Sequence, residues 1–135
     1  MSLITAIRRF LYTHGWLKIT YLDIPVIVVG NITLGGTGKT PLIIYLAQLL
    51  QQHGYQPGIV SRGYGGKNKN YPCSVTPDSD PILMGDEPVL MATKAGVPVI
   101  VDPDRVSAAR FLQKNYPHCN IILSDDGLQH YALGR

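Results

Sequence analysis

A glycine-rich segment between a short apolar run and a helical pattern constrains the fold more than any other feature. Residues 25–30 are apolar up to Gly30, which suits a strand buried on both faces of a parallel sheet. Residues 41–53 carry Leu and Ile at helical spacing, with Pro41 at the start and Gly54 just past the end. The segment between them, residues 30–40, reads GNITLGGTGKT. A strand, a glycine-rich loop and a helix in this order are typical of a phosphate-binding loop.

The residue types of this loop suit phosphate chemistry. Glycines let successive backbone N–H groups surround an anion, and the following helix directs its positive end to the same place. Lys39 adds a cation for the β- and γ-phosphates, and the Thr40 hydroxyl can bind Mg²⁺. The strict motif has glycine where Thr33 stands, so the alternative is a chance glycine-rich turn. We expect nucleotide contacts from Asn31, Gly35, Gly36, Thr37, Gly38, Lys39 and Thr40.

The rest of the chain alternates between strand and helix patterns. Strands are expected at residues 58–61, 97–101 and 120–124, and helices at 86–95 and 104–115. The connections are short except for an irregular stretch, residues 63–82, which has a possible strand at 71–76. The pattern predicts an α/β fold, a phosphate-loop type of parallel sheet flanked by helices. Four strands are few for such a domain, so we expect an N-terminal piece of a longer protein.

Residues 1–22 differ from the remaining domain, residues 23–135. They carry apolar residues at helical spacing, together with basic and aromatic side chains: Arg8, Arg9, Lys18, Tyr12, Trp16 and Tyr21. A basic amphipathic helix of this kind can lie at a membrane surface. The alternative is a helix that packs on the domain's own core or on a partner.

Two acids follow the last expected strand. Asp125 and Asp126 come directly after the apolar residues 121–123 and Ser124. Carboxyl ends of parallel strands share one edge of a sheet, so Asp125 should emerge beside Gly30. Carboxylates in this place hold Mg²⁺ directly or through water, opposite the Thr40 hydroxyl. The sequence therefore predicts Thr40, Asp125 and Asp126 as metal ligands.

Composition excludes several classes of protein. A chain of 135 residues fits one domain, and 45% hydrophobic with 16% charged residues is too apolar for a disordered segment. A net charge of +3 gives no electrostatic case for a nucleic-acid partner. Cys73 and Cys119 form no CxxC pair, which argues against a zinc ribbon or redox motif. The only Asn-Lys pair, Asn68-Lys69, lacks the acid that guanine recognition requires.

Two further residues each have two possible roles. Arg62 follows the second strand and can bind an anionic group of substrate or ATP, or it belongs to an ordinary surface turn. Asp86 opens a helix, and its spacing alone favours a helix N-cap.

The motifs together resemble the tetraacyldisaccharide 4'-kinases, the lipid A 4'-kinases of Gram-negative bacteria. Five blocks match in the family's order across about residues 25–135: residues 29–31 with 35–41, 60–66, 85–88, 101–105 and 124–131. Members of that family are more than twice as long as this chain. The resemblance implies transfer of phosphate from ATP, with Mg²⁺, to the 4'-hydroxyl of an acylated glucosamine disaccharide. It also implies peripheral attachment to the cytoplasmic face of the inner membrane.

The same resemblance implies individual roles. Asp86 becomes the candidate general base, with Lys39 as the second catalytic residue. Gln129 and His130 would position nucleotide or metal. The candidate substrate-binding residues are Arg62, Gly63 and Tyr64. Two alternatives remain: another phosphate-loop ATPase or small-molecule kinase, and a nucleotide-binding fragment without independent activity.

Overall fold

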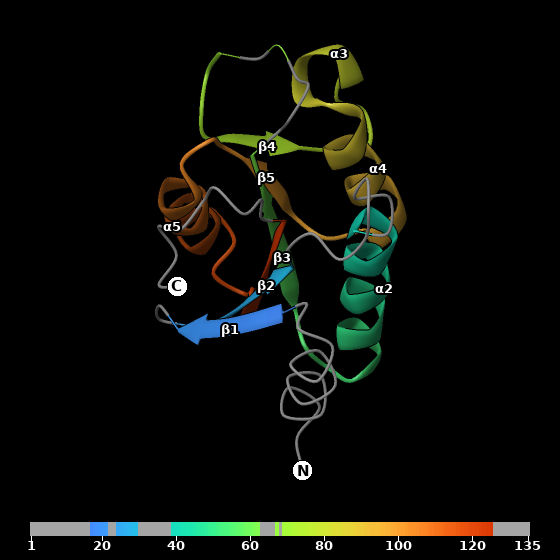
Figure 1. Cartoon of the computed structure of the whole chain (residues 1–135), viewed down its shortest axis with the longest axis vertical. Helices are drawn as coiled ribbons and strands as arrows, with labels where there is room; N and C mark the ends of the chain where they lie inside the picture. The colour runs from blue at the N-terminus through green and yellow to red at the C-terminus, as the bar shows by residue number, and fades with distance from the viewer. Residues whose placement is uncertain (1–16, 22–23, 30–38, 63–66, 68, 126–135) are drawn as a thin grey trace.

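The computed structural model describes residues 17–21, 24–29, 39–62, 67 and 69–125. Within these ranges, six strands form one sheet in the order β1-β2-β6-β3-β5-β4 (Figure 1). The inner strands β2, β6, β3 and β5 run parallel, whereas β1 and β4 pair antiparallel at the two edges. The strands are β1 (Leu17–Tyr21), β2 (Pro25–Val29), β3 (Pro57–Ser61), β4 (Cys73–Val75), β5 (Val99–Val101) and β6 (Ile121–Asp125).

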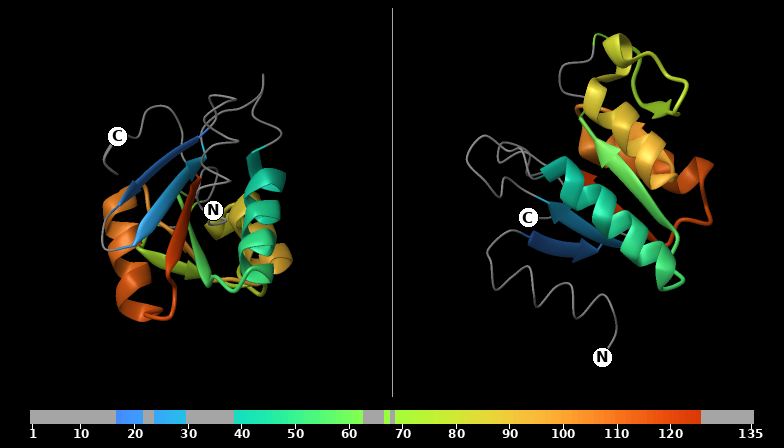
Figure 2. Two further views of the ribbon diagram at one scale, coloured as in Figure 1. Left: turned by 90° about the horizontal axis from the view of Figure 1, so that it is seen from below. Right: turned by 90° about the vertical axis from the view of Figure 1, so that its right-hand side faces the viewer.

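Helices cover both faces of this sheet. They are α2 (Lys39–Gln52), α3 (Pro81–Met84), α4 (Asp86–Ala95) and α5 (Arg105–Asn115). Helices α2 and α4 lie on one face and α5 on the other, as the left view of Figure 2 shows. The right-handed connections between parallel strands explain why the helices are divided between the two faces. The chain steps across the sheet in one direction from β2 to β3 to β5, then steps back from β5 to β6, which transfers α5 to the opposite face.

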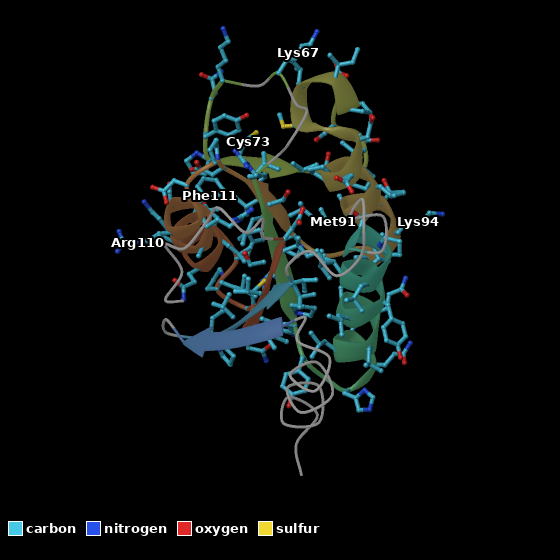
Figure 3. All side chains as sticks on the ribbon, in the orientation of Figure 1. Lys67, Cys73, Met91, Lys94, Arg110 and Phe111 are labelled. Atoms are coloured by element: carbon cyan, nitrogen blue, oxygen red, sulfur yellow. The ribbon has the colours of Figure 1, made fainter. Side chains whose placement is uncertain are left out.

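Strand alternation builds two hydrophobic cores. In β2, Ile27 and Val29 pack in the cluster with α2 and α4, whereas Val26 and Val28 pack in the cluster with α5. Figure 3 shows Met91 of α4 on the inner side of that helix, where it is fully buried, and Lys94 directed away from the molecule. Both faces of the inner strands are therefore apolar, as their continuous apolar sequences predict.

Most of the expected elements are confirmed. Strands β2, β3, β5 and β6 occupy the four expected positions, and α2, α4 and α5 match the three expected helices of the domain. Strand β4 lies inside the possible strand at residues 71–76. The four-residue helix α3 was not expected. It begins at Pro81, and Asp80 is its N-cap, with a side chain that accepts a hydrogen bond from the Ile82 N–H. Both residues lie in the stretch that the sequence indicates to be a loop.

The expected helix over residues 1–22 is wrong at its carboxyl end, because Leu17–Tyr21 forms strand β1. Its sequence, LKITY, alternates apolar and polar residues with the period of a strand. The strand pairs with β2 along its whole length, from Leu17 opposite Val29 to Tyr21 opposite Pro25. The sheet therefore includes residues on both sides of the expected boundary at 22/23. Residues 1–16 lie outside the described part of the chain.

Among the residues that the structure describes, no helix has both the length and the apolar character that a membrane crossing requires.

Candidate active site

Three chain segments that carry candidate residues end at the same edge of the sheet. Val29, the last residue before the glycine-rich segment, lies opposite Asp125 in the register of β2 and β6. Ser61, the last residue of β3, lies opposite Asp125 on its other side. The Asp102 N–H after β5 donates to the Ser61 carbonyl at 2.9 Å. The expected meeting of the loop strand and the acid strand is therefore confirmed.

Asp125 is a buried carboxylate at this edge, with 7% of its surface exposed. It shares the α2 face of β6 with Ile121 and Leu123, because alternate strand residues share a face. The Ser61 hydroxyl donates to its Oδ2 at 3.2 Å. A buried carboxylate is costly unless it is hydrogen-bonded or bound to a cation. Asp126, the second expected metal ligand, lies outside the described residues.

Helix α2 begins at Lys39, directly after the glycine-rich segment. Thr40 is buried, and its hydroxyl donates a hydrogen bond to Oε2 of Glu87 in the first turn of α4. This bond brings together the N-terminal ends of α2 and α4. Both helices thereby direct the positive ends of their dipoles toward the same region, which suits an anion.

Asp86 is the first residue of α4, and its side chain is exposed. The expectation that Asp86 serves as the N-cap is wrong, because Gly85 occupies that position and no side chain caps the helix. Gly85 has φ 95° and ψ 145°, a conformation that side chains disfavour and glycine accepts. The Asp86 carboxylate is therefore not used for capping, and it lies one residue before the partner of Thr40.

The remaining expected residues divide into described and undescribed positions. Arg62 is half-buried directly after β3, on the edge that carries Asp125. The Lys39 backbone is placed at the start of α2. The expected roles of Asn31, Gly35, Gly36, Thr37, Gly38, Gly63, Tyr64, Gln129 and His130 fall outside the described residues and stay predictions.

The described donors at this edge suit Mg²⁺. The Thr40 hydroxyl and the Asp125 carboxylate supply hard oxygen atoms, which Mg²⁺ prefers as ligands. Among the described residues, no group of three or more His, Cys, Asp and Glu side chains could hold a metal. That result is compatible with Mg²⁺, which typically keeps several waters and takes one or two protein carboxylates plus substrate phosphates.

Two contributors at this edge were not expected from the sequence. Ser61 bonds Asp125, and Glu87 bonds Thr40. Ser61 could have been identified from the sequence, because it places a hydroxyl at the end of an apolar strand. Glu87 has none, because its contact depends on how α4 packs beside α2.

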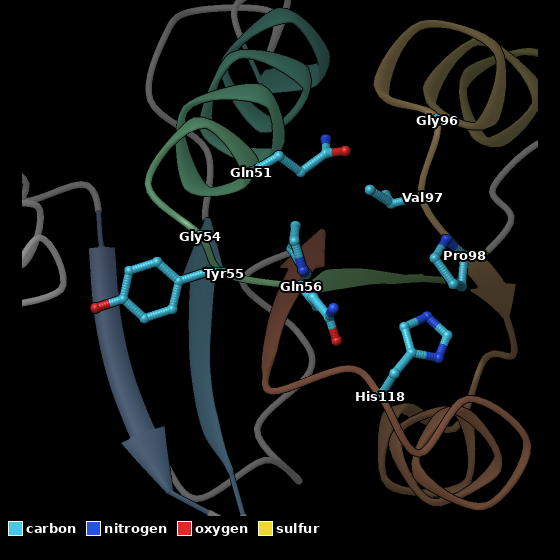
Figure 4. A pocket seen from close by; sticks show the side chains of 9 residues that line it. Gln51, Gly54, Tyr55, Gln56, Gly96, Val97, Pro98 and His118 are labelled. Atoms are coloured by element: carbon cyan, nitrogen blue, oxygen red, sulfur yellow. The ribbon is translucent and has the colours of Figure 1, made fainter.

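A separate hollow lies at the opposite, amino-terminal edge of the sheet. It measures about 380 Å³ and is lined by the end of α2, the start of β3, the segment before β5 and His118 (Figure 4). Gln51 at its rim donates to the carbonyls of Ala47 and Ala95, which joins α2 to α4. None of the candidate residues that the structure describes lines this hollow.

A mostly parallel sheet with helices on both faces and polar residues at its carboxyl edge defines an α/β domain of the open-sheet class. Such domains bind ligands outside the carboxyl ends of their strands, where the strand order reverses. The chain belongs to the tetraacyldisaccharide-1-P 4'-kinase family, whose model matches residues 1–135. This result confirms the family resemblance of the sequence motifs.

Individual relatives agree with the family assignment. A tetraacyldisaccharide 4'-kinase of Nitrosococcus oceani is 59% identical over 134 residues, which cover 99% of this chain and 39% of that protein. One from Coxiella burnetii is 50% identical, with 99% and 41% covered. The crystal structure of LpxK from Aquifex aeolicus, described as an "apo" form in complex with ATP, matches with a TM-score of 0.66 and 36% identity. That match covers 91% of this chain and 39% of the other. The chain thus spans about two fifths of the length of these relatives.

Proposed function

We propose that this chain serves the ATP-dependent phosphorylation of the 4'-hydroxyl of a tetraacylated glucosamine disaccharide 1-phosphate, a step of lipid A biosynthesis. The observation that carries the proposal is the hydrogen bond from Thr40 to Glu87. It brings the start of α2, where the phosphate loop is expected to end, next to the turn that begins with Asp86. Family membership and the relatives' names support the choice of substrate.

The reaction transfers a phosphoryl group between two oxygens. The sugar 4'-oxygen forms a bond to the γ-phosphorus, and the bond from that phosphorus to the bridging oxygen of ADP breaks. In the proposal Asp86 accepts the proton of the attacking hydroxyl as a general base. Its exposed position at the start of α4 leaves room for a bulky lipid acceptor. The substrate contacts are assigned to Arg62, Gly63 and Tyr64.

The charges of the triphosphate require neutralisation. Lys39, the loop N–H groups of residues 35–40 and the N-terminus of α2 supply positive charge to the β- and γ-phosphates. Mg²⁺, when bound, neutralises charge that develops between these phosphates. Thr40, Asp125 and Asp126 would hold it, with Gln129 and His130 beside them.

The membrane assignment is proposed for a shorter segment than the sequence suggested. Residues 1–16 contain Arg8, Arg9 and all of the helically spaced apolar residues, whereas residues 17–21 belong to the sheet. We assign attachment to the cytoplasmic surface of the inner membrane to residues 1–16. A substrate with acyl chains stays in the bilayer, so its kinase has to work at that surface.

A phosphoryl-transfer assay tests the proposed function. The chain is joined to the part of the Nitrosococcus oceani relative that it does not cover, and transfer from γ-labelled ATP to the lipid acceptor is measured in detergent micelles. We expect labelled lipid from the parent fusion and about 10²- to 10⁴-fold slower transfer from its Asp86→Asn variant, with ATP affinity unchanged. Transfer to soluble acceptors but not to the lipid would favour a small-molecule kinase. ATP binding without transfer to any acceptor would contradict the assignment.

A further inference from the structure

Helices α2 and α4 lie side by side on one face of the sheet and are joined by hydrogen bonds along their length. At the far end, Gln51 donates to the Ala95 carbonyl at 3.0 Å, and Gln48 donates to the Lys94 carbonyl at 3.2 Å. At the end near the candidate site, the Thr40 hydroxyl donates to the Glu87 carboxylate. Unlike the other two, this bond joins two side chains, a hydroxyl donor and a carboxylate acceptor.

The position of Thr40 explains why its hydroxyl needs an acceptor from another element. A helical threonine commonly bonds a carbonyl three or four residues earlier in its own helix. Thr40 is the second residue of α2, so no earlier turn of that helix supplies such a carbonyl. The side chain is 4% exposed, which leaves little access to water. Glu87 therefore fixes the direction of the only proton that this hydroxyl can donate.

We propose that Glu87 is a positioning residue that orients the Thr40 hydroxyl oxygen toward the Mg²⁺–nucleotide complex. This inference rests on the proposed function. A hydroxyl has one proton and two lone pairs, so a hydroxyl that donates its proton to Glu87 keeps its lone pairs for a cation. Carboxylates that accept hydrogen bonds from metal ligands orient those ligands and raise their basicity. Glu87 would act through Thr40, while its neighbour Asp86 faces the acceptor substrate.

A purely structural role makes a different prediction. An acid in the first turn of α4 also stabilises that helix through its dipole, with or without a ligand. That role would change nucleotide affinity equally in the presence and absence of Mg²⁺. The positioning role changes only the gain in affinity that Mg²⁺ provides.

The test measures the Kd of this chain for ATP by isothermal titration calorimetry, with Mg²⁺ and with EDTA. The Mg²⁺-dependent gain is the ratio of the Kd in EDTA to the Kd with Mg²⁺. We expect Glu87→Ala to reduce this gain about tenfold or more, with the Kd in EDTA unchanged. Glu87→Gln keeps an acceptor oxygen and should recover part of the gain. Gln48→Ala is the matched control, because it removes another bond between the same helices and should leave the gain unchanged.

The effect of Glu87→Ala is also measured in a protein that lacks the Thr40 hydroxyl. In Thr40→Val, which lacks the hydroxyl, the additional Glu87→Ala change should have no further effect on the gain. If Glu87→Ala does not fold, the comparison of Glu87→Gln with Thr40→Val decides, and the glutamine variant should lose less. Equal losses with Mg²⁺ and EDTA, or no change, would overturn the positioning role. A parent chain that binds no ATP under either condition would instead contradict the proposed function.

Discussion

Thr40 and Asp125 are buried polar residues, and each is hydrogen-bonded to a side chain of another element. Thr40 bonds Glu87 of α4, and Asp125 bonds Ser61 of β3. A buried carboxylate costs free energy unless it is hydrogen-bonded or bound to a cation. Asp86, in contrast, is exposed. The two environments suit the proposed division of labour, with Asp125 held for a cation and Asp86 open to an acceptor.

The sequence predicts part of this arrangement. Asp125 is predictable because an acid at the end of an apolar strand must emerge at the carboxyl edge of a parallel sheet. The general-base role proposed for Asp86 comes only from the family resemblance and stays a prediction, since the spacing alone favours the capping role that Gly85 fills. Glu87 is not predictable, because its contact depends on the lengthwise alignment of α2 and α4, which side-chain packing sets.

Cys119 gives a prediction about pH at the residue scale. Burial raises the pKa of its thiol from 9.0 to about 11, because the interior disfavours the thiolate. The folded chain therefore holds a proton that the unfolded chain releases above pH 9. The contribution of the buried, protonated thiol to the free energy of unfolding is complete below pH 9 and is lost as the pH rises toward 11.

Urea unfolding of the parent and Cys119→Ala at pH 8 and pH 10.5 checks this effect. The stability advantage of the parent over the variant should shrink by about 2 kcal/mol at the higher pH. All other side chains are the same in both proteins, so the difference isolates Cys119. An advantage that stays constant would show that the thiol pKa is not raised.

Among the secondary-structure elements, the inner strands and the longer helices are predictable from local sequence patterns, whereas the short elements β1 and α3 are not. The inner strands are continuous apolar runs, and the longer helices have apolar faces and clear ends. Strand β1 has five residues, and its alternating LKITY sequence adjoins a segment with helical spacing. Helix α3 has four residues among Pro, Asp and Ser, where turn signals dominate. Tertiary pairing with β2, rather than local preference, selects the strand at β1.

The contact between α5 and β3 gives a prediction at this scale. A Cβ built on Gly58 would lie 2.6 Å from Cδ2 of Leu112 and 3.2 Å from the Cys119 sulfur. Leu112 is fully buried, so its methyl groups have little room to move. Gly58→Ala should reduce the free energy of unfolding by about 1–3 kcal/mol.

Chemical denaturation measures this loss, and two further variants test its cause. Combining Gly58→Ala with Leu112→Ala should cost less than the sum of the two single changes. Ser124→Ala on β6 is the control. Within the described residues its buried hydroxyl has no hydrogen-bond partner, so the change should be nearly neutral or stabilising. A stable Gly58→Ala protein would contradict the tight packing of α5.

At the scale of the whole molecule, the order of the strands determines which ends meet. The sequence predicts parallel strands but not that β6 inserts between β2 and β3, because that choice depends on long-range pairing. This insertion places Asp125 between the ends of β2 and β3. The antiparallel edge strand β1 shows that the first residues of the sheet precede the expected domain boundary.

Truncations separate the membrane segment from the sheet. Deletion of residues 1–16 should abolish sedimentation with vesicles that contain anionic lipid, while the Tm stays close to that of the parent. Deletion of residues 1–22 should also lower the Tm, because it removes β1 and exposes the edge of β2. Unchanged sedimentation of the 1–16 deletion would locate membrane binding elsewhere in the chain.

We propose that a triphosphate binds where the start of α2 meets the acid-bearing end of β6. Calorimetric titration of this chain with Mg²⁺–ATP tests it most directly, with Lys39→Ala as the comparison. We expect saturable binding by the parent chain and an affinity about a hundredfold weaker for Lys39→Ala, because the β- and γ-phosphates lose their cation. Equal affinities for the two proteins, or no binding by the folded parent, would contradict it.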